Sequence, residues 1–285
     1  MKEPRIDLMR FPGGLSKALT FSYDDGVLQD KRLLAILNRN GLKGTFNLGS
    51  AVLGKIERNA FGGSVDISKV APGEVAELYA GHEVAGHGLF HSSLTGIGSG
   101  AALYEIIEDR KRLEDLIGGM VRGFAYPGGS YSEDAKQMLK YAGYEYARIV
   151  PTTGTFAIPN DFYEWSGTAH HNDPNLMQLA HDFFEGDKRM AFRAQLFYLW
   201  GHAYEFDQFN NWNVIEDFAS YAAQFADSTW FATNIEICDY VKSFRKLIYS
   251  ADASRIYNPT CITLWLANRR DVYKIEPGET VTIKE

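Results

Sequence analysis

Hydrophobic stretches of strand length alternate with amphipathic stretches of helical length along most of this chain. The clearest helix is expected over 101–117, where Leu103, Ile106, Leu113 and Leu116 recur near the helical period of 3.6 residues. The same patterns predict strands over 17–23, 44–48, 83–86, 121–126, 145–150, 162–165, 196–200 and 229–231, and further helices over 28–39, 72–79, 134–141, 174–184, 214–225 and 235–249.

About seven or eight such alternations predict parallel strands joined by crossover helices, in a barrel or an open doubly wound sheet. After residue 249 the pattern changes to short apolar runs over 261–267, 272–275 and 280–283. These runs predict a small antiparallel sheet that is too small to fold alone. We therefore expect an α/β domain over 1–250 and a small β extension packed on it over 251–285.

Charge and cysteine content exclude several classes of protein. The chain has 29 Lys and Arg against 36 Asp and Glu, which gives a formal net charge of −7. The sequence contains no block of basic residues that would indicate a nucleic-acid-binding face. Two cysteines, Cys238 and Cys261, are too few for a disulfide framework or a zinc ribbon, and Cys238 is expected to be buried. No run of 18 apolar residues predicts a membrane span.

The N-terminal residues 1–14 lack the basic start and apolar segment of a signal peptide. The protein is therefore expected to be cytoplasmic if the sequence is complete. It is expected to be secreted or in the cell envelope if a signal peptide has been removed. The sequence does not predict the oligomeric state.

Two adjacent carboxylates, Asp24 and Asp25, follow the first predicted strand. Two buried and ionised carboxylates are costly side by side, unless one binds a metal and the other exchanges a proton. A solvated Asp-Asp-Gly turn, which is common, explains the same residues. On this segment alone the turn is the favoured interpretation.

Two histidines, His87 and His91, follow the strand over 83–86 and lie four residues apart. A tight loop or one helical turn would bring both imidazoles to one face, where neutral imidazole is a common metal ligand. Two histidines and one carboxylate would leave an open position on a catalytic divalent ion. A metal site and a structural pair both remain open here.

A third histidine, His202, ends the strand over 196–200. At the mouth of a barrel it could act as a general acid, and inside the core it would only form hydrogen bonds. Glu205 follows three residues later, where it would either orient His202 or form a surface charge.

Four segments in order resemble the motifs of the polysaccharide deacetylases of carbohydrate esterase family 4. Residues 20–26 resemble the Thr-Phe-Asp-Asp-Gly motif, and residues 81–91 resemble its Gly-His-Glu segment with two histidines, which is the most specific match. Residues 124–129, Phe-Ala-Tyr-Pro-Gly-Gly, resemble the third motif, and 199–202 match Leu-x-x-His. Together these matches span residues 18–202, which is most of the chain.

The resemblance implies a distorted (β/α) barrel of seven to eight strands over 1–250 and a divalent metal held by Asp25, His87 and His91. The metal is expected to be zinc, with cobalt, nickel or manganese as alternatives. It further implies that a metal-bound water attacks an acetyl group, with roles for each motif. Asp24 would be the general base, the N–H of Gly128 would hold the oxyanion, His202 would protonate the leaving amine and Leu199 would line the acetyl pocket.

Two departures from the family pattern affect these expectations. The arginine that begins the third motif is replaced by Ala125, and Arg148 in the next strand is expected either to reach the base instead or to form a structural salt bridge. The fourth motif, an Asp…Asp-Trp pattern, is not recognisable, although Asp161 and Trp165 lie in that stretch.

Aromatic residues near the motifs are candidates for stacking on sugar rings, although core packing accounts for most aromatic side chains. We expect Tyr126, Tyr204 and Trp212 to contact substrate. His170 and His171 are either a surface pair or part of a loop over the site.

The sequence thus predicts a metal-dependent deacetylase that acts on N-acetylated amino sugars in poly- or oligosaccharides and therefore hydrolyses a C–N bond. The expected partner is an acetylated carbohydrate. Two alternatives remain: hydrolysis of another acetylated carbohydrate or small amide on the same fold, and a carbohydrate-binding barrel without catalysis.

Overall fold

The predicted alternation of strands and helices is present in the computed structural model, which describes residues 8–58, 65–186, 193–268 and 271–283. Residues 1–7, part of the N-terminal segment from which localisation was predicted, lie outside these ranges, as do 284 and 285 of the predicted extension. Within the described residues, no helix combines the length and the apolar character needed to cross a membrane.

The central sheet is parallel throughout and has the order β7-β6-β5-β4-β3-β2-β9-β8, with β10 paired to β2. The strands are β2 (Lys17–Asp24), β3 (Thr45–Leu48), β4 (Glu83–Gly86), β5 (Gly123–Ala125), β6 (Tyr146–Thr152), β7 (Trp165–Gly167), β8 (Ala169–His170), β9 (Gln195–His202) and β10 (Thr229–Phe231).

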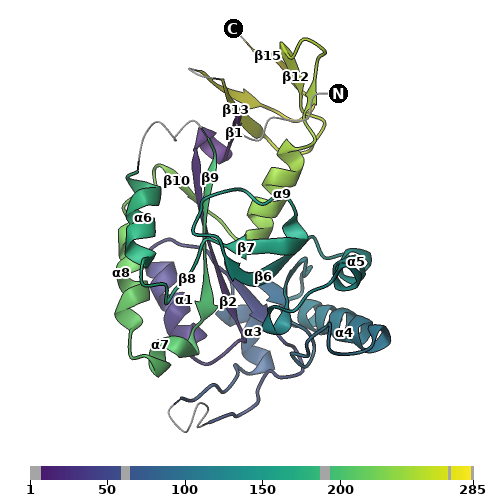
Figure 1. Cartoon of the computed structure of the whole chain (residues 1–285), viewed down its shortest axis with the longest axis vertical. Coiled ribbons are helices and arrows are strands. Elements are labelled where there is room, and N and C mark those ends of the chain that lie inside the picture. Colours follow the sequence, from purple (N-terminus) through teal and green to yellow (C-terminus); the bar gives the residue numbers. More distant parts are fainter. Residues whose placement is uncertain (1–7, 59–64, 187–192, 269–270, 284–285) are drawn as a thin grey trace.

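The sheet curves until its two ends nearly meet. The N–H of Thr168, just after β7, donates to the carbonyl of Tyr198 on β9 at 2.8 Å. The eight-strand path therefore forms a nearly closed barrel, which confirms the predicted distorted (β/α) barrel. Parallel pairing requires long crossovers, and the helices that supply them lie on the outside of the strands (Figure 1).

The α-helices are α1 (Asp30–Arg39), α3 (Val75–Leu78), α4 (Ser99–Ile117), α5 (Glu133–Tyr141), α6 (Leu176–Phe184), α7 (Tyr204–Gln208), α8 (Trp212–Ala223) and α9 (Asn234–Phe244). The short 3₁₀ helices are η2 (Pro12–Gly14), η3 (Pro72–Glu74), η4 (Pro127–Gly129) and η5 (Phe162–Glu164).

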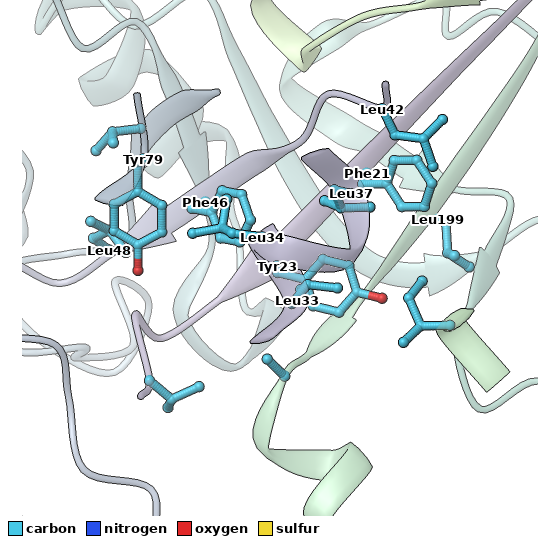
Figure 2. Packing of buried hydrophobic residues seen from close by; sticks show 14 of the residues in the cluster. Phe21, Tyr23, Leu33, Leu34, Leu37, Leu42, Phe46, Leu48, Tyr79 and Leu199 are labelled. Carbon is cyan, nitrogen blue, oxygen red and sulfur yellow. The ribbon is translucent and has the colours of Figure 1, made fainter. Parts of the chain in front are cut away.

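The amphipathic pattern of α1 explains how it covers the sheet. Its buried residues include Leu33, Leu34 and Leu37, which belong to the same core cluster as Phe21 of β2 and Phe46 of β3. Figure 2 shows these side chains packed together. Each fully buried leucine or phenylalanine stabilises the fold by roughly 1.5–3 kcal/mol, so this packing fixes β2 and β3, which carry site residues at their ends.

Two predicted elements differ from the structure. Residues 162–164, predicted as strand, form η5 because the Asp161 carboxylate accepts the N–H of Tyr163 at 2.8 Å and caps the turn. The helix predicted over 235–249 ends at Phe244, and Ile248–Tyr249 instead form β11. The antiparallel pairing of β11 with β12 (Arg255–Tyr257) satisfies the backbone groups of this segment.

Two small antiparallel sheets lie beyond the barrel, at one end of the molecule in Figure 1. One contains β1 (Met9–Arg10), β13 (Leu264–Asn268) and β14 (Asp271–Ile275), and the other contains β11, β12 and β15 (Thr280–Thr282). The first sheet joins the start of the described chain to its C-terminal region. Cys238 is buried and Cys261 exposed, and both are free thiols.

Candidate active site

The carboxyl ends of β2, β3 and β9 bring three polar side chains into one row. In strand register, Asp24 of β2 is level with Asn47 of β3 on one side and with His202 of β9 on the other. Active sites of parallel barrels form at this end of the strands.

Asp24 is almost completely buried and has four polar neighbours. Its Oδ1 accepts the side-chain N–H of Asn47 at 2.8 Å, and its Oδ2 pairs with the Arg148 guanidinium. Its Oδ2 also lies 3.8 Å from Nε2 of both His87 and His202. Burial alone would raise the pKa of Asp24, but Arg148 and the other neighbours hold this pKa below its usual value. Asp24 is therefore ionised at neutral pH.

Asp25 has a left-handed backbone with φ of 82°, which is uncommon for a residue other than glycine. Its N–H donates to the carbonyl of Asn47 at 2.9 Å, which helps hold this turn. Its Oδ1 lies 3.9 Å from His87 Nε2 and 3.7 Å from His91 Nε2. Its other oxygen, Oδ2, lies 3.7 Å from the ammonium of Lys69.

The donor set of Asp25, His87 and His91 fits a divalent metal ion. Their three ligand atoms all lie within 4.8 Å of one another. His87 Nδ1 lies 2.8 Å from the carbonyl of Ala125, an acceptor that places the ring proton on Nδ1 and leaves the Nε2 lone pair facing Asp25. Burial lowers the pKa of His87 to about 4, so the ring is neutral, the state that binds metal.

His202 is held by Glu205, the second residue of the short helix α7. The Glu205 Oε2 atom lies 3.4 Å from His202 Nδ1 and accepts the backbone N–H of His202 at 3.1 Å. Burial would lower the pKa of His202, but Glu205 and the two site aspartates raise it above its usual value. The ring therefore faces Asp24 with Nε2 and Glu205 with Nδ1.

His170 and His171 contact the same carboxylate. Their Nε2 atoms lie 3.1 and 3.2 Å from Glu205 Oε2, so these three residues also have the composition of a metal site. However, His170 Nδ1 accepts the N–H of Asn172, which leaves the proton on Nε2 toward Glu205. This arrangement favours a Glu205 carboxylate that accepts a hydrogen bond from His170 and does not bind a metal ion. His171 reaches this carboxylate because Gly201, with no Cβ, leaves room for its ring.

Arg148 belongs to β6, and its side chain extends to Asp24 of β2. Its guanidinium stacks 4.4 Å from the Trp200 ring centre, and it is 1% exposed. Its Nε and Nη1 atoms have no hydrogen-bond partner among the described residues. Its polar interactions are therefore concentrated on Asp24.

The structure places the remaining predicted residues in different surroundings. Gly128 lies in η4 directly after β5, with φ of 61°. Leu199 is completely buried in the core, level with Phe21 of β2. Tyr204 lies 5.3 Å from His202 between ring centres, and the carboxylates of Asp25 and Glu205 help raise its pKa, although burial is the largest cause.

Tyr126 and Trp212 offer little surface to a ligand. Tyr126 is fully buried and its hydroxyl donates to the carbonyl of Tyr163 at 3.1 Å. Trp212 is 7% exposed, donates to Asp207 at 2.7 Å and is covered by Arg32. The structure therefore does not bring these two predicted substrate contacts to the row of polar residues.

Two neighbours of the site were not predicted from the sequence. Asn47 is an internal residue of β3, and its place beside Asp24 follows only from the register of β2 and β3. Lys69 is nearly buried and reaches Asp25 from an irregular segment before η3. Neither residue belongs to a motif, so no signal in the sequence identifies them.

Comparisons with known proteins agree with this geometry. The sequence profile of the polysaccharide deacetylase family matches residues 6–147, which include Asp24, Asp25, His87 and His91. No curated protein matches the chain in sequence.

Two solved structures, both provisionally assigned as polysaccharide deacetylases, share the fold. One, from Pseudomonas aeruginosa PAO1, has 14% identity and a TM-score of 0.58 over 84% of this chain and 93% of its own. The other, from Mycobacterium smegmatis, has 17% identity and a TM-score of 0.56 over 85% and 95%. With the profile match and the ordered motifs, this chain belongs to the polysaccharide deacetylase family, carbohydrate esterase family 4.

Proposed function

We propose that this protein is a metal-dependent hydrolase that removes acetyl groups from N-acetylated amino sugars in poly- or oligosaccharides. The observation that carries the proposal is the convergence of Asp25, His87 and His91 beside the ionised Asp24. Family membership supports the acetyl chemistry, and the neutral His87 ring supports a metal at Asp25.

In this proposal Asp25, His87 and His91 hold the divalent ion, with zinc as the expected metal. A bound divalent ion lowers the pKa of water and polarises a carbonyl group. Asp25 is a suitable anionic ligand because its Oδ1 faces both imidazoles while Lys69 lies beside Oδ2. Lys69 thereby favours coordination through one oxygen.

Asp24 is the proposed general base that accepts a proton from water. A base must be ionised and fixed within reach of that proton, and Arg148 and Asn47 provide both conditions. Arg148 would thus replace the missing arginine of the third motif. The N–H of Gly128 is the proposed donor to the oxyanion of the tetrahedral intermediate.

His202 is the proposed general acid that donates the Nε2 proton to the leaving amine nitrogen. Glu205 beside Nδ1 stabilises the protonated ring and fixes its orientation. Tyr204 is the proposed substrate contact among the predicted aromatic residues, because its ring lies beside His202. The proposed substrate partner is an acetylated carbohydrate.

Acetate release from N-acetylated chitooligosaccharides by the zinc-loaded protein tests this proposal. We expect Asp24→Asn to lower kcat by about 10²- to 10⁴-fold, since general base catalysis contributes factors of that size. Asp182→Asn, at an exposed position on α6, is the matched control and keeps full activity. A parallel panel of O-acetylated sugars and small cyclic amides identifies the substrate class.

Two outcomes contradict the proposal. If Asp24→Asn and His87→Ala release acetate as fast as the unchanged protein, the proposed chemistry is wrong. If zinc binds but none of the acetylated sugars is hydrolysed, the site binds carbohydrate without deacetylating it or acts on the other substrates of the panel.

A further inference from the structure

Helix α4 buries two carboxylates on the face that it turns toward the barrel. Glu105 and Asp109 are 5% and 0% exposed, one helical turn apart, beside the buried Ile106 and Leu113. A buried carboxylate is costly unless it is paired or hydrogen-bonded. Together they accept hydrogen bonds from the segments that follow β3 and β4. These bonds offset the cost of burying the two carboxylates.

Asp109 joins the ends of these two strands. Its Oδ1 accepts the backbone N–H of Ser50 at 2.7 Å, just after β3. Its Oδ2 accepts the backbone N–H of His87 at 3.1 Å, just after β4. The same N–H lies 2.9 Å from the carbonyl of Leu48, so the backbone at His87 is fixed by two acceptors.

Glu105 holds the backbone on both sides of His91. Its Oε2 accepts the N–H of Phe90 at 2.9 Å, and its Oε1 accepts the hydroxyl of Ser92 at 3.0 Å. Its backbone carbonyl accepts the N–H of Leu89 at 3.2 Å. His91 itself has a left-handed backbone with φ of 62°, a conformation that persists only where its surroundings hold it.

We propose that Glu105 and Asp109 are positioning residues that orient His87 and His91 toward Asp25 before a metal ion binds. This inference rests on the proposed function, because it takes those three residues as the ligands. A loop that is already ordered loses little conformational freedom on binding, so its histidines bind metal more tightly. Outer partners of metal ligands typically change metal affinity by about 10- to 100-fold.

The test is the zinc dissociation constant of the metal-free protein, measured by competition with a chromogenic chelator at neutral pH. We expect Asp109→Asn and Glu105→Ala each to weaken zinc binding by about 10- to 100-fold. An asparagine cannot accept from both N–H groups, and an alanine removes both acceptors of Glu105. Circular dichroism and the thermal midpoint of the metal-free protein show whether each variant is folded.

Glu105→Gln separates hydrogen bonding from charge. Its amide oxygen accepts the Phe90 N–H and its NH₂ group donates to the Ser92 hydroxyl, so we expect affinity near that of the unchanged protein. The Ala and Gln variants of Glu105 decide the question by themselves if Asp109→Asn does not fold.

Two controls separate positioning from general loss of stability. Glu83→Gln alters another buried carboxylate with three hydrogen bonds, at the far end of β4. Glu108→Ala alters a neighbouring residue of α4. We expect both to bind zinc as tightly as the unchanged protein, whatever their thermal midpoints.

The possible failures are distinguishable. Unchanged zinc affinity in folded Asp109→Asn and Glu105→Ala overturns the positioning role alone. Equal weakening by Glu83→Gln overturns it as well, because the effect would then follow stability. If the unchanged protein binds no zinc, the proposed metal site fails and the positioning role fails with it.

Discussion

Arg148 and Asp24 form a buried ion pair although they lie 124 residues apart in the chain. Their side chains are 1% and 3% exposed, so each needs the other to offset the loss of hydration. The pair keeps Asp24 ionised beside His87, which is neutral, and His202, which is partly charged. It therefore links the stability of the barrel to the proposed base.

Replacing Arg148 by methionine tests this link. Removing one partner of a buried pair destabilises a protein by about 3–5 kcal/mol, which urea unfolding measures. The pKa of Asp24 rises without the guanidinium, so the acidic limb of the kcat/KM profile moves to higher pH. The control is Arg32→Met, which removes a similar arginine that stacks on Trp212 and pairs with the exposed Glu216. An unmoved acidic limb would show that Arg148 is only structural.

Glu205→Gln tests how the proposed acid is held. His202→Ala removes the acid and lowers kcat by about 10²- to 10⁴-fold. Glu205→Gln keeps the ring but removes a charge that raises the pKa of His202. Activity requires protonated His202, so we expect a smaller loss of kcat and a basic limb moved to lower pH. Glu185→Gln, beside the exposed His181, provides the control. A basic limb that stays in place argues against Glu205 as the partner.

Asp25→Asn isolates the metal ligand from the backbone turn. Asparagine accepts the left-handed conformation of Asp25 readily, so the variant loses the ligand charge without backbone strain. At a free zinc concentration about 100 times the Kd, binding stabilises the unchanged protein by about 2.7 kcal/mol. This corresponds to a rise of roughly 5–10 °C in the thermal midpoint. The variant should show a much smaller rise, and an equal rise would place zinc elsewhere.

Much of the site could be predicted because its residues sit at strand ends. Asp24, Asp25, His87 and His202 follow apolar runs, and parallel strands bring their carboxyl ends together. The pairing of Arg148 with Asp24 was one of two interpretations, since no local pattern specifies which residue lies across a barrel. Lys69, Glu105 and Asp109 act through tertiary contacts alone and carry no sequence signal.

The aromatic residues show the limit of composition as a guide. Tyr126 lies in a motif, yet its ring packs in the core and its hydroxyl bonds to Tyr163. Trp212 begins α8 and is covered by Arg32, whereas Tyr204 does lie beside His202. Type and position alone do not tell which way a ring points. The division of the chain near residue 250 remains a prediction, and β1 pairs with β13 across it.

A buried carboxylate at the start of β4 predicts how stability depends on pH. Glu83 accepts bonds from Thr45, Tyr146 and the N–H of Ile235, but burial dominates and raises its pKa from 4.5 to about 7. Between those values the folded protein binds more protons than the unfolded chain. The free energy of unfolding contributed by Glu83 therefore falls as pH rises through this window.

The shift corresponds to on the order of 3 kcal/mol between pH 4 and pH 8. Glu83→Gln does not titrate, so the stability difference between the unchanged protein and this variant should fall by that amount over the window. Urea unfolding of both proteins at each pH measures the difference, with Glu77→Gln at an exposed position of α3 as control. A difference that stays constant would mean that Glu83 keeps its ordinary pKa in the fold, because its three hydrogen bonds then offset the effect of burial.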